Sequence, residues 1–172
     1  MKFLGNADPQ AFSSEEELLS ELYRQMLKVA RYKLYNKNDA VDVVQEAWVR
    51  ILEHGSTLRD SDKLIPWAKA IASNLASNAN RSKKVETIDD DYVRDLSGLG
   101  SNSEPELLAE LSDLLGRLDP QARTLLLYKF YYGFRDDEIA AALSVPVGTV
   151  KARIHRSKAR AKQQVREEFP HT

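Results

Sequence analysis

The chain has 172 residues, and 25 lysines and arginines stand against 26 aspartates and glutamates, for a formal net charge of −1. Hydrophobic residues make up 42% and charged residues 30%, which is typical of a globular protein with a modest core. The absence of cysteine excludes disulfides and thiolate metal sites. No apolar run approaches the ~20 residues of a membrane span, and the N-terminus turns polar too soon for a signal peptide. We therefore expect a cytoplasmic protein without direct membrane insertion, made of one domain or two small ones.

No motif for catalysis or metal binding is present in the sequence. The three histidines, His54, His155 and His171, are far apart and show neither HxxxH nor HExxH spacing. A GxSxG elbow, a phosphate-binding loop and a GxGxxG fingerprint are all missing. We therefore expect no enzyme activity, no cofactor and no bound metal.

The first half of the chain has the periodicity of two helices followed by a loop and a third helix. Ser14 and Glu17 form a capping-box pattern before an apolar stripe that reaches Leu34. Asp39 is placed to cap the second helix, and Gly55 to end it in a left-handed conformation. The inward stripe predicted for this second helix is Val41, Val44, Trp48, Ile51 and Leu52.

A polar loop over residues 56–64 and a third helix from Pro66 to about Arg81 follow. Trp67 lies on the apolar stripe of this helix, as Trp48 does on the one before. We therefore predict that both tryptophans belong to the core rather than to a base-stacking surface.

Residues 86–106 differ in composition from the rest of the chain. They contain seven acids and one base, with glycine and serine concentrated in residues 97–103. This composition predicts a flexible acidic linker between two domains. One continuous bundle with a long loop is the alternative, but about 20 structureless residues inside a compact domain are unusual.

The second half of the chain predicts a helix from Leu107, another from Pro120 to Tyr132, and then a helix-turn-helix. In this motif the helix over residues 136–143 is followed by a three-residue break and a helix that starts at Val147. Residues 147–166 contain seven lysines or arginines and no acid. Positive charge is thus concentrated on one segment of a nearly neutral chain, as a phosphate-binding surface requires.

Helical geometry separates two sides of this last helix. Val147, Val150 and Ile154 define the buried side, so Ala152 and Arg156 point away from it. Arg156 is the best candidate for a bidentate contact with guanine, while Arg153, Lys158 and Arg160 suit phosphates. A generic basic face is the alternative. The residues of this helix predicted to contact DNA are Thr149, Lys151, Ala152, Arg153, His155, Arg156, Lys158 and Arg160.

The sequence resembles the two conserved domains of bacterial sigma factors in the order and spacing of three stretches, residues 39–48, 66–74 and 118–156. The short two-domain form is similar to the extracytoplasmic-function group of the sigma-70 family. The resemblance implies an all-α fold with a sigma-two-like helical bundle, an acidic linker and a sigma-four-like helix-turn-helix domain. We place these at residues 1–84, 85–106 and 107–172, and residues 1–13 have no assigned role.

The resemblance implies a promoter-specificity subunit with no chemistry of its own. It would bind core RNA polymerase and promoter DNA, reading the −35 box with the helix-turn-helix and the −10 box as melted single strand. The first domain would bind the clamp helices of the largest subunit, and the second domain the flap of the second subunit. In this group an anti-sigma factor commonly holds the protein inactive. The linker would thread polymerase channels, where its carboxylates mimic RNA.

The resemblance also assigns residues in the first domain. Asn74 would lie beside the pocket for a flipped −10 base, with Arg59 in the loop that forms the pocket wall. Arg81, Lys83 and Lys84 would contact phosphates. The predicted core-polymerase-binding residues are Asp39, Asp42, Gln45, Glu46 and Arg50.

Two of the departures from the family pattern concern the helix over residues 136–143. Ser144 replaces a common turn glycine, which predicts a left-handed and slightly strained residue. Arg135 replaces the usual serine before residues 136–143, so we expect Asp136 to cap that helix. A free-standing helix-turn-helix regulator would explain residues 107–165 equally well, but it would leave the first domain without a role.

Overall fold

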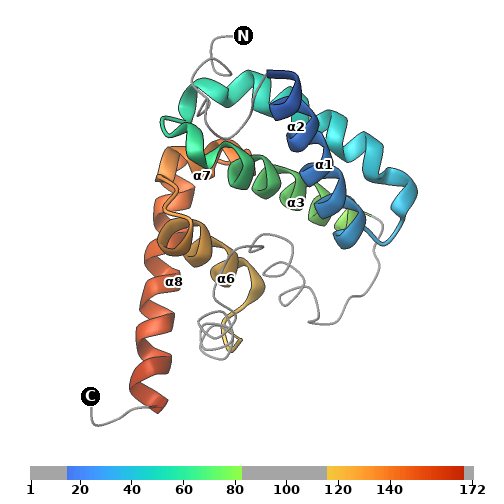
Figure 1. Cartoon of the computed structure of the whole chain (residues 1–172). Coiled ribbons are helices and arrows are strands. Elements are labelled where there is room, and N and C mark those ends of the chain that lie inside the picture. Colours follow the sequence, from blue (N-terminus) through green and yellow to red (C-terminus); the bar gives the residue numbers. More distant parts are fainter. Residues whose placement is uncertain (1–14, 83–115, 169–172) are drawn as a thin grey trace. The chain divides into compact units, whose positions relative to one another are not determined.

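The computed structural model describes residues 15–82 and 116–168, and every regular element within these ranges is helical (Figure 1). The chain divides into two compact units, with the main boundary between residues 87 and 88. The predictions for Ser14, residues 1–13, Lys83, Lys84, the linker and the helix from Leu107 to residue 115 lie outside the described residues. No helix in the described part of the chain is both long and apolar enough to cross a membrane.

The first unit contains the three helices predicted from periodicity. They are α1 (Glu15–Lys33), α2 (Ala40–His54) and α3 (Leu64–Ser82). Three single 3-10 turns join them: η2 (Lys37–Asp39), η3 (Gly55–Thr57) and η4 (Ser61–Lys63). The polar loop predicted over residues 56–64 contains most of η3 and all of η4, and α3 begins at Leu64, two residues before the predicted start at Pro66.

The core of the first unit is built around α3, on which both α1 and α2 pack. Trp67 is completely buried, as predicted, whereas Trp48 is only half-buried. Burying a large side chain of this kind contributes roughly 1.5–3 kcal/mol, so these contacts dominate the stability of the unit. The other residues at 0% exposure here are Leu22, Met26, Ala30, Val44, Ala47, Ile51, Ala68, Ile71, Ala72 and Ala76.

Buried polar contacts fix the end of α1 against α3. The Asn80 amide nitrogen donates to the Lys33 carbonyl at 2.9 Å, and its oxygen accepts from the Tyr35 amide at 3.1 Å. Lys33 Nζ donates to Ser73 Oγ at 2.9 Å. Because the last carbonyls of a helix have no partner within it, Asn80 satisfies one of them inside the core.

At both ends of α2 the predicted capping interaction is absent from the structure. Asp39 occupies the N-cap position, but its side chain makes no capping hydrogen bond; Asn36 instead caps the preceding turn through the Asn38 amide. Gly55 has φ −58° and ψ −28°, so it is right-handed and begins η3. The glycine continues the chain into another helical turn and does not terminate it.

The second unit contains α6 (Pro120–Leu126), which continues as a π-helical turn, η5 (Leu127–Tyr131), followed by α7 (Asp136–Leu143) and α8 (Val147–Glu168). Leu118, Ala122, Leu126 and Leu127 form a buried cluster against which Ala161 of α8 packs. Tyr128, Tyr132 and Phe134 follow, with the Tyr132 and Phe134 rings stacked at 5.8 Å. The predicted helix-turn-helix is therefore held on an apolar base from α6 and η5.

Asp119 caps α6 as predicted and also ties α8 to it. Its Oδ1 accepts the Ala122 amide at 3.0 Å, and its Oδ2 lies 2.8 Å from Arg160 NH1. Gln164 donates to the Arg117 carbonyl at 3.0 Å. The start of α6 and the second half of α8 are thus joined by polar contacts.

The prediction that Asp136 caps α7 was wrong. Arg135 stands at the N-cap position, and its amide donates to Glu138 Oε1 at 2.9 Å. Asp136 instead pairs with Lys129 at 3.0 Å. Glu138 is 2% exposed, and Arg135 Nε lies 3.5 Å from the same oxygen, so the buried carboxylate has both an amide donor and a cation.

The turn of the helix-turn-helix contains the left-handed residue that the sequence predicted. Ser144 has φ 53° and ψ 47°, and it is the one non-glycine residue with positive φ in the described ranges. This conformation costs an L-residue roughly 1–2 kcal/mol. The amides of Ser144 and Val145 both donate to the Ala140 carbonyl, which closes α7.

Lys69 on α3 is a buried cation, with 5% of its surface exposed. Burial lowers its pKa below 10.5, and the nearby positive charges of Lys28 and Arg24 lower it further. The ammonium form is therefore penalised in the folded state. No prediction from the sequence identified this residue.

Replacing Ser144 with glycine should stabilise the second unit by about 1 kcal/mol, because glycine adopts the left-handed conformation without strain. The measurement is urea unfolding of the full chain by circular dichroism. Tryptophan fluorescence follows the first unit separately, since Trp48 and Trp67 are the two tryptophans of the chain. Ala152→Gly, in a right-handed helical position, is the control and should destabilise by about 1 kcal/mol. An unchanged or lower midpoint for Ser144→Gly would contradict the strain argument.

Replacing Lys69 with methionine should stabilise the first unit by about 1 kcal/mol or more at pH 7 in phosphate-free buffer, because a buried charge is removed. The folded-state pKa lies below the unfolded value, so the penalty is full at low pH and disappears as pH rises toward 10.5. The stability difference between variant and wild type should shrink accordingly. Thermal melts by tryptophan fluorescence measure it, with exposed Arg31→Met as the control. A destabilised Lys69→Met would refute this reasoning.

Candidate nucleic-acid and protein interfaces

One side of α2 is exposed and carries the polar residues predicted to bind polymerase. Asp42, Gln45 and Glu46 are exposed, whereas Asp39 and Arg50 are half-buried. Arg50 NH2 lies 4.0 Å from Glu46 Oε1, at the limit of an ion pair. Exposed pairs of this kind contribute about 0.3–0.5 kcal/mol, so Glu46 remains available to a partner.

The same helix exposes apolar residues that the sequence analysis had placed inward or had not considered. Val41 is 46% exposed and Leu52 52%, which corrects the predicted stripe, and Val49 is 54% exposed. At 100° per residue, these side chains lie beside Asp42 and Glu46. The buried side of α2 is formed instead by Ala40, Val43, Val44, Ala47 and Ile51. An apolar strip next to a polar one is typical of a protein interface.

The residues predicted to contact the −10 box lie on α3 and on the segment before it. Arg59 is exposed between η3 and η4, and Arg81 is exposed in the last turn of α3. Asn74 is half-buried, and its Nδ2 is shielded from solvent without a hydrogen-bond partner. A buried amide group without a partner costs roughly 1–3 kcal/mol, which a ligand could recover.

The outward side of α8 has the composition that the sequence predicted. Lys151, Ala152, His155 and Arg156 are exposed, while Thr149 and Arg153 are half-buried. Val150 and Ile154 are buried as expected, but Val147 is 38% exposed, contrary to prediction. Val147 lies at the first turn, where the helix has just begun.

Two cations predicted to bind phosphate also make contacts within the second unit. Arg160 pairs with Asp119, as described above, and Lys158 Nζ lies 5.2 Å from the centre of the Phe130 ring. Both side chains remain on the surface. A phosphate contact by Arg160 would compete with its bond to Asp119, so any contribution of Arg160 to DNA binding would be smaller than that of an unpaired arginine.

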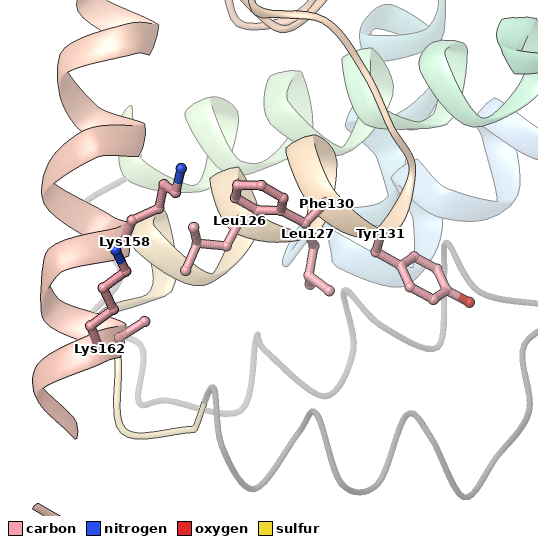
Figure 2. A pocket seen from close by; sticks show the side chains of 7 residues that line it. Leu126, Leu127, Phe130, Tyr131, Lys158 and Lys162 are labelled. Carbon is pink, nitrogen blue, oxygen red and sulfur yellow. The ribbon is translucent and has the colours of Figure 1, made fainter. Parts of the chain in front are cut away.

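An apolar pocket of about 340 Å³ lies between α8 and the α6–η5 segment (Figure 2). Phe130, 58% exposed, stands at its edge, and two lysines of α8 border it. No pattern in the sequence predicted this pocket. Its lining residues are Leu126, Leu127, Phe130, Tyr131, Lys158, Ala161 and Lys162.

Within residues 15–82 and 116–168, no group of histidines and acids is arranged to hold a metal ion. The described surface is instead divided into a mixed apolar and acidic face on α2, a basic face on α8 and an apolar pocket. Such surfaces bind macromolecules, and each has a different chemistry.

Comparisons with known proteins agree with this arrangement. Residues 18–85 match the family model for sigma-70 region 2, and residues 108–160 match the model for sigma-70 region 4. The chain is 28% identical over 182 residues to the ECF RNA polymerase sigma factor SigW of Bacillus subtilis, which covers 97% of this chain and 95% of the relative. It is 30% identical over 156 residues to SigL of Mycobacterium tuberculosis, covering 84% and 87%.

Among solved structures, the sigma factor RpoE from Bartonella quintana, in complex with the anti-sigma factor NepR, covers 88% of this chain and 96% of its own. The sequence identity between the two chains is 18% and the TM-score is 0.43, which is too low to support a conclusion about this chain. The region 2 match accounts for the first unit, which a free-standing helix-turn-helix regulator leaves unexplained. The chain is a member of the extracytoplasmic-function group of the sigma-70 family, whose non-catalytic members direct RNA polymerase in transcription initiation.

Proposed function

We propose that this sigma factor binds the clamp helices of the largest polymerase subunit through the exposed side of α2. The observation that carries the proposal is the pairing of exposed Val41, Val49 and Leu52 with Asp42 and Glu46 on one helix. The apolar side chains supply buried area, and the charged side chains supply orientation. An anti-sigma factor would inhibit the protein by covering the same surface.

The apolar pocket of the second unit suits the flap of the second polymerase subunit. Its leucines, with Phe130 at the edge, would receive an apolar side chain from a helix, and Lys158 and Lys162 would pair with acids around that side chain. The pocket and the outward side of α8 share Lys158 at their border but otherwise use different residues. One domain could therefore hold the flap and the −35 box together.

At the −10 box, Asn74 is the residue that the geometry favours. Its unpartnered amide nitrogen can donate to a base edge, and its oxygen can accept from one. A base flipped from the melted strand would satisfy this group, which offsets part of the unstacking cost. Arg59 and Arg81 would bind the adjacent phosphates without specifying sequence.

On α8, Arg156 is proposed to read a guanine of the −35 box, with Lys151, Ala152 and His155 nearby on the same exposed side. Gly148 in the first turn is also exposed, and a β-carbon there would meet no atom within 4 Å. Packing against other parts of the chain therefore does not require glycine at this position, and a close approach of DNA backbone would account for it.

Glu46→Lys and Leu52→Gln should each weaken binding to core polymerase about tenfold, because each removes one kind of contact from the α2 surface. Binding is measured with fluorescently labelled full-length protein and sigma-free core. Tyr23→Gln on α1, where an apolar side chain is 42% exposed, is the matched control and should bind as wild type does. Normal binding by both α2 variants, with normal tryptophan melts, would exclude this surface.

The promoter reading is tested by run-off transcription on fragmented genomic DNA, followed by sequencing of RNA 5′ ends. Wild type should give discrete starts that share two upstream boxes. Arg156→Ala should weaken the preference for one base pair of the upstream box. The discrimination against other base pairs at that position should fall by ~1–3 kcal/mol. Arg153→Ala should weaken binding to all sequences alike and lower the salt dependence. Equal effects of the two variants on every promoter would contradict the assignment of Arg156.

A further inference from the structure

We propose that the apolar pocket of the second unit binds a free fatty acid, with the alkyl chain against the leucines and Phe130 and the carboxylate at Lys158 and Lys162 (Figure 2). The pocket is formed within the second unit alone, and Lys158 is the one lining residue that was also expected to contact DNA. The assignment of the ligand rests on the lining of the pocket, its size and the charge at its border.

Three residues of the lining come from the π-helical turn η5. In this turn the Tyr132 amide donates to the Leu127 carbonyl, five residues earlier, at 3.0 Å. Turns of this kind are rare and occur frequently at functional sites. Leu127, Phe130 and Tyr131 of the turn all line the pocket, and Phe130 is 58% exposed. A ligand that covers the Phe130 ring removes apolar surface from water, which favours binding.

The volume of the pocket suits an alkyl chain. A dry cavity of about 150 Å³ accommodates the six carbons of benzene, so the pocket of about 340 Å³ has room for roughly twelve carbons. A single leucine side chain would leave most of this space unfilled and would lose the corresponding contacts. A chain of medium length fills it.

The two lysines determine the sign of the charge on the head group. They lie four residues apart on α8, which places them on the same side of the helix, and both border the pocket. No acid lines the pocket, and neither lysine is paired with an acid within the described part of the second unit. Lys158 Nζ lies 5.2 Å from the centre of the Phe130 ring, so one ammonium group is held directly beside the apolar surface. An anionic head is therefore attracted where the chain ends, and a cationic head is repelled.

A fatty acid in this pocket would compete with the polymerase flap, which is proposed above to occupy the same place. The competition rests on that proposed function, whereas the fatty-acid site itself does not. Binding to the free protein and competition with core polymerase are therefore measured separately.

Binding is measured by isothermal titration calorimetry on the full chain, with dodecanoate at concentrations that form no micelles. Dodecanoate should bind at one site per chain. Octanoate should bind at least tenfold more weakly, because each buried methylene contributes up to about fourfold. Dodecyltrimethylammonium, which has the same chain and a cationic head, should also bind at least tenfold more weakly. Equal binding of the anionic and cationic chains would indicate adsorption to apolar surface in general and would overturn the site, as would no binding of dodecanoate.

Variants at exposed positions locate the site. Phe130→Ser and the double variant Lys158→Gln/Lys162→Gln should each weaken dodecanoate binding about tenfold, while circular dichroism melts show that the variants are folded. Arg166→Gln removes an exposed cation of α8 outside the pocket and should bind dodecanoate as wild type does. Wild-type affinity in both pocket variants would refute the proposal.

The competition is tested with fluorescently labelled full-length protein and sigma-free core polymerase. Dodecanoate should weaken the binding of wild type to core, and it should have little effect on the Lys158→Gln/Lys162→Gln variant. If dodecanoate binds the free protein but leaves core binding unchanged, the fatty-acid site stands and the assignment of the flap to this pocket fails. If dodecanoate does not bind the free protein, the fatty-acid site fails and the assignment of the flap is unaffected.

Discussion

The packing of α1 and α2 on α3 determines what the first unit can offer to partners. Because Trp67, Ile71 and their neighbours are buried by the other two helices, α3 keeps few exposed positions, among them Arg81 and the edge at Asn74. The core uses small residues of α2, such as Ala40 and Ala47, and this frees larger apolar side chains of that helix for its outer side. The same packing therefore creates both the stable bundle and the α2 surface.

Periodicity identified the described helices of both units, and the spacing of residues 118–156 identified the helix-turn-helix. It failed in part on the orientation of α2, because that helix is apolar on two adjacent sides. Val44 and Ile51 are buried as predicted, but Val41 and Leu52 satisfy an inward stripe as well as Ala40 and Ala47 do, and sequence spacing contains no information about which stripe meets α3. A hydrophobic side chain that binds a partner follows the same pattern as one that fills a core.

The remaining differences concern side-chain contacts between neighbouring turns. Ser144 could be predicted as left-handed because it replaces a turn glycine that is common in the family pattern. The sequence could not show that Glu138, and not Asp136, accepts the amide hydrogen bond at the start of α7. Asp136 instead pairs with Lys129 of the preceding π-helical turn, a contact that local spacing does not reveal. The pocket bordered by Phe130 likewise depends on how α8 crosses η5, which no local pattern specifies.

Buried polar groups in the described residues illustrate how unsatisfied groups separate structure from binding. Glu138 is surrounded by its own helix start and by Arg135, so its burial is explained by the fold itself. The Asn74 amide nitrogen on α3 is shielded from solvent without a hydrogen-bond partner. A fold that leaves such a group without a partner loses stability, and a bound base restores it. Because α3 carries this group, a ligand there would stabilise the helix on which α1 and α2 depend.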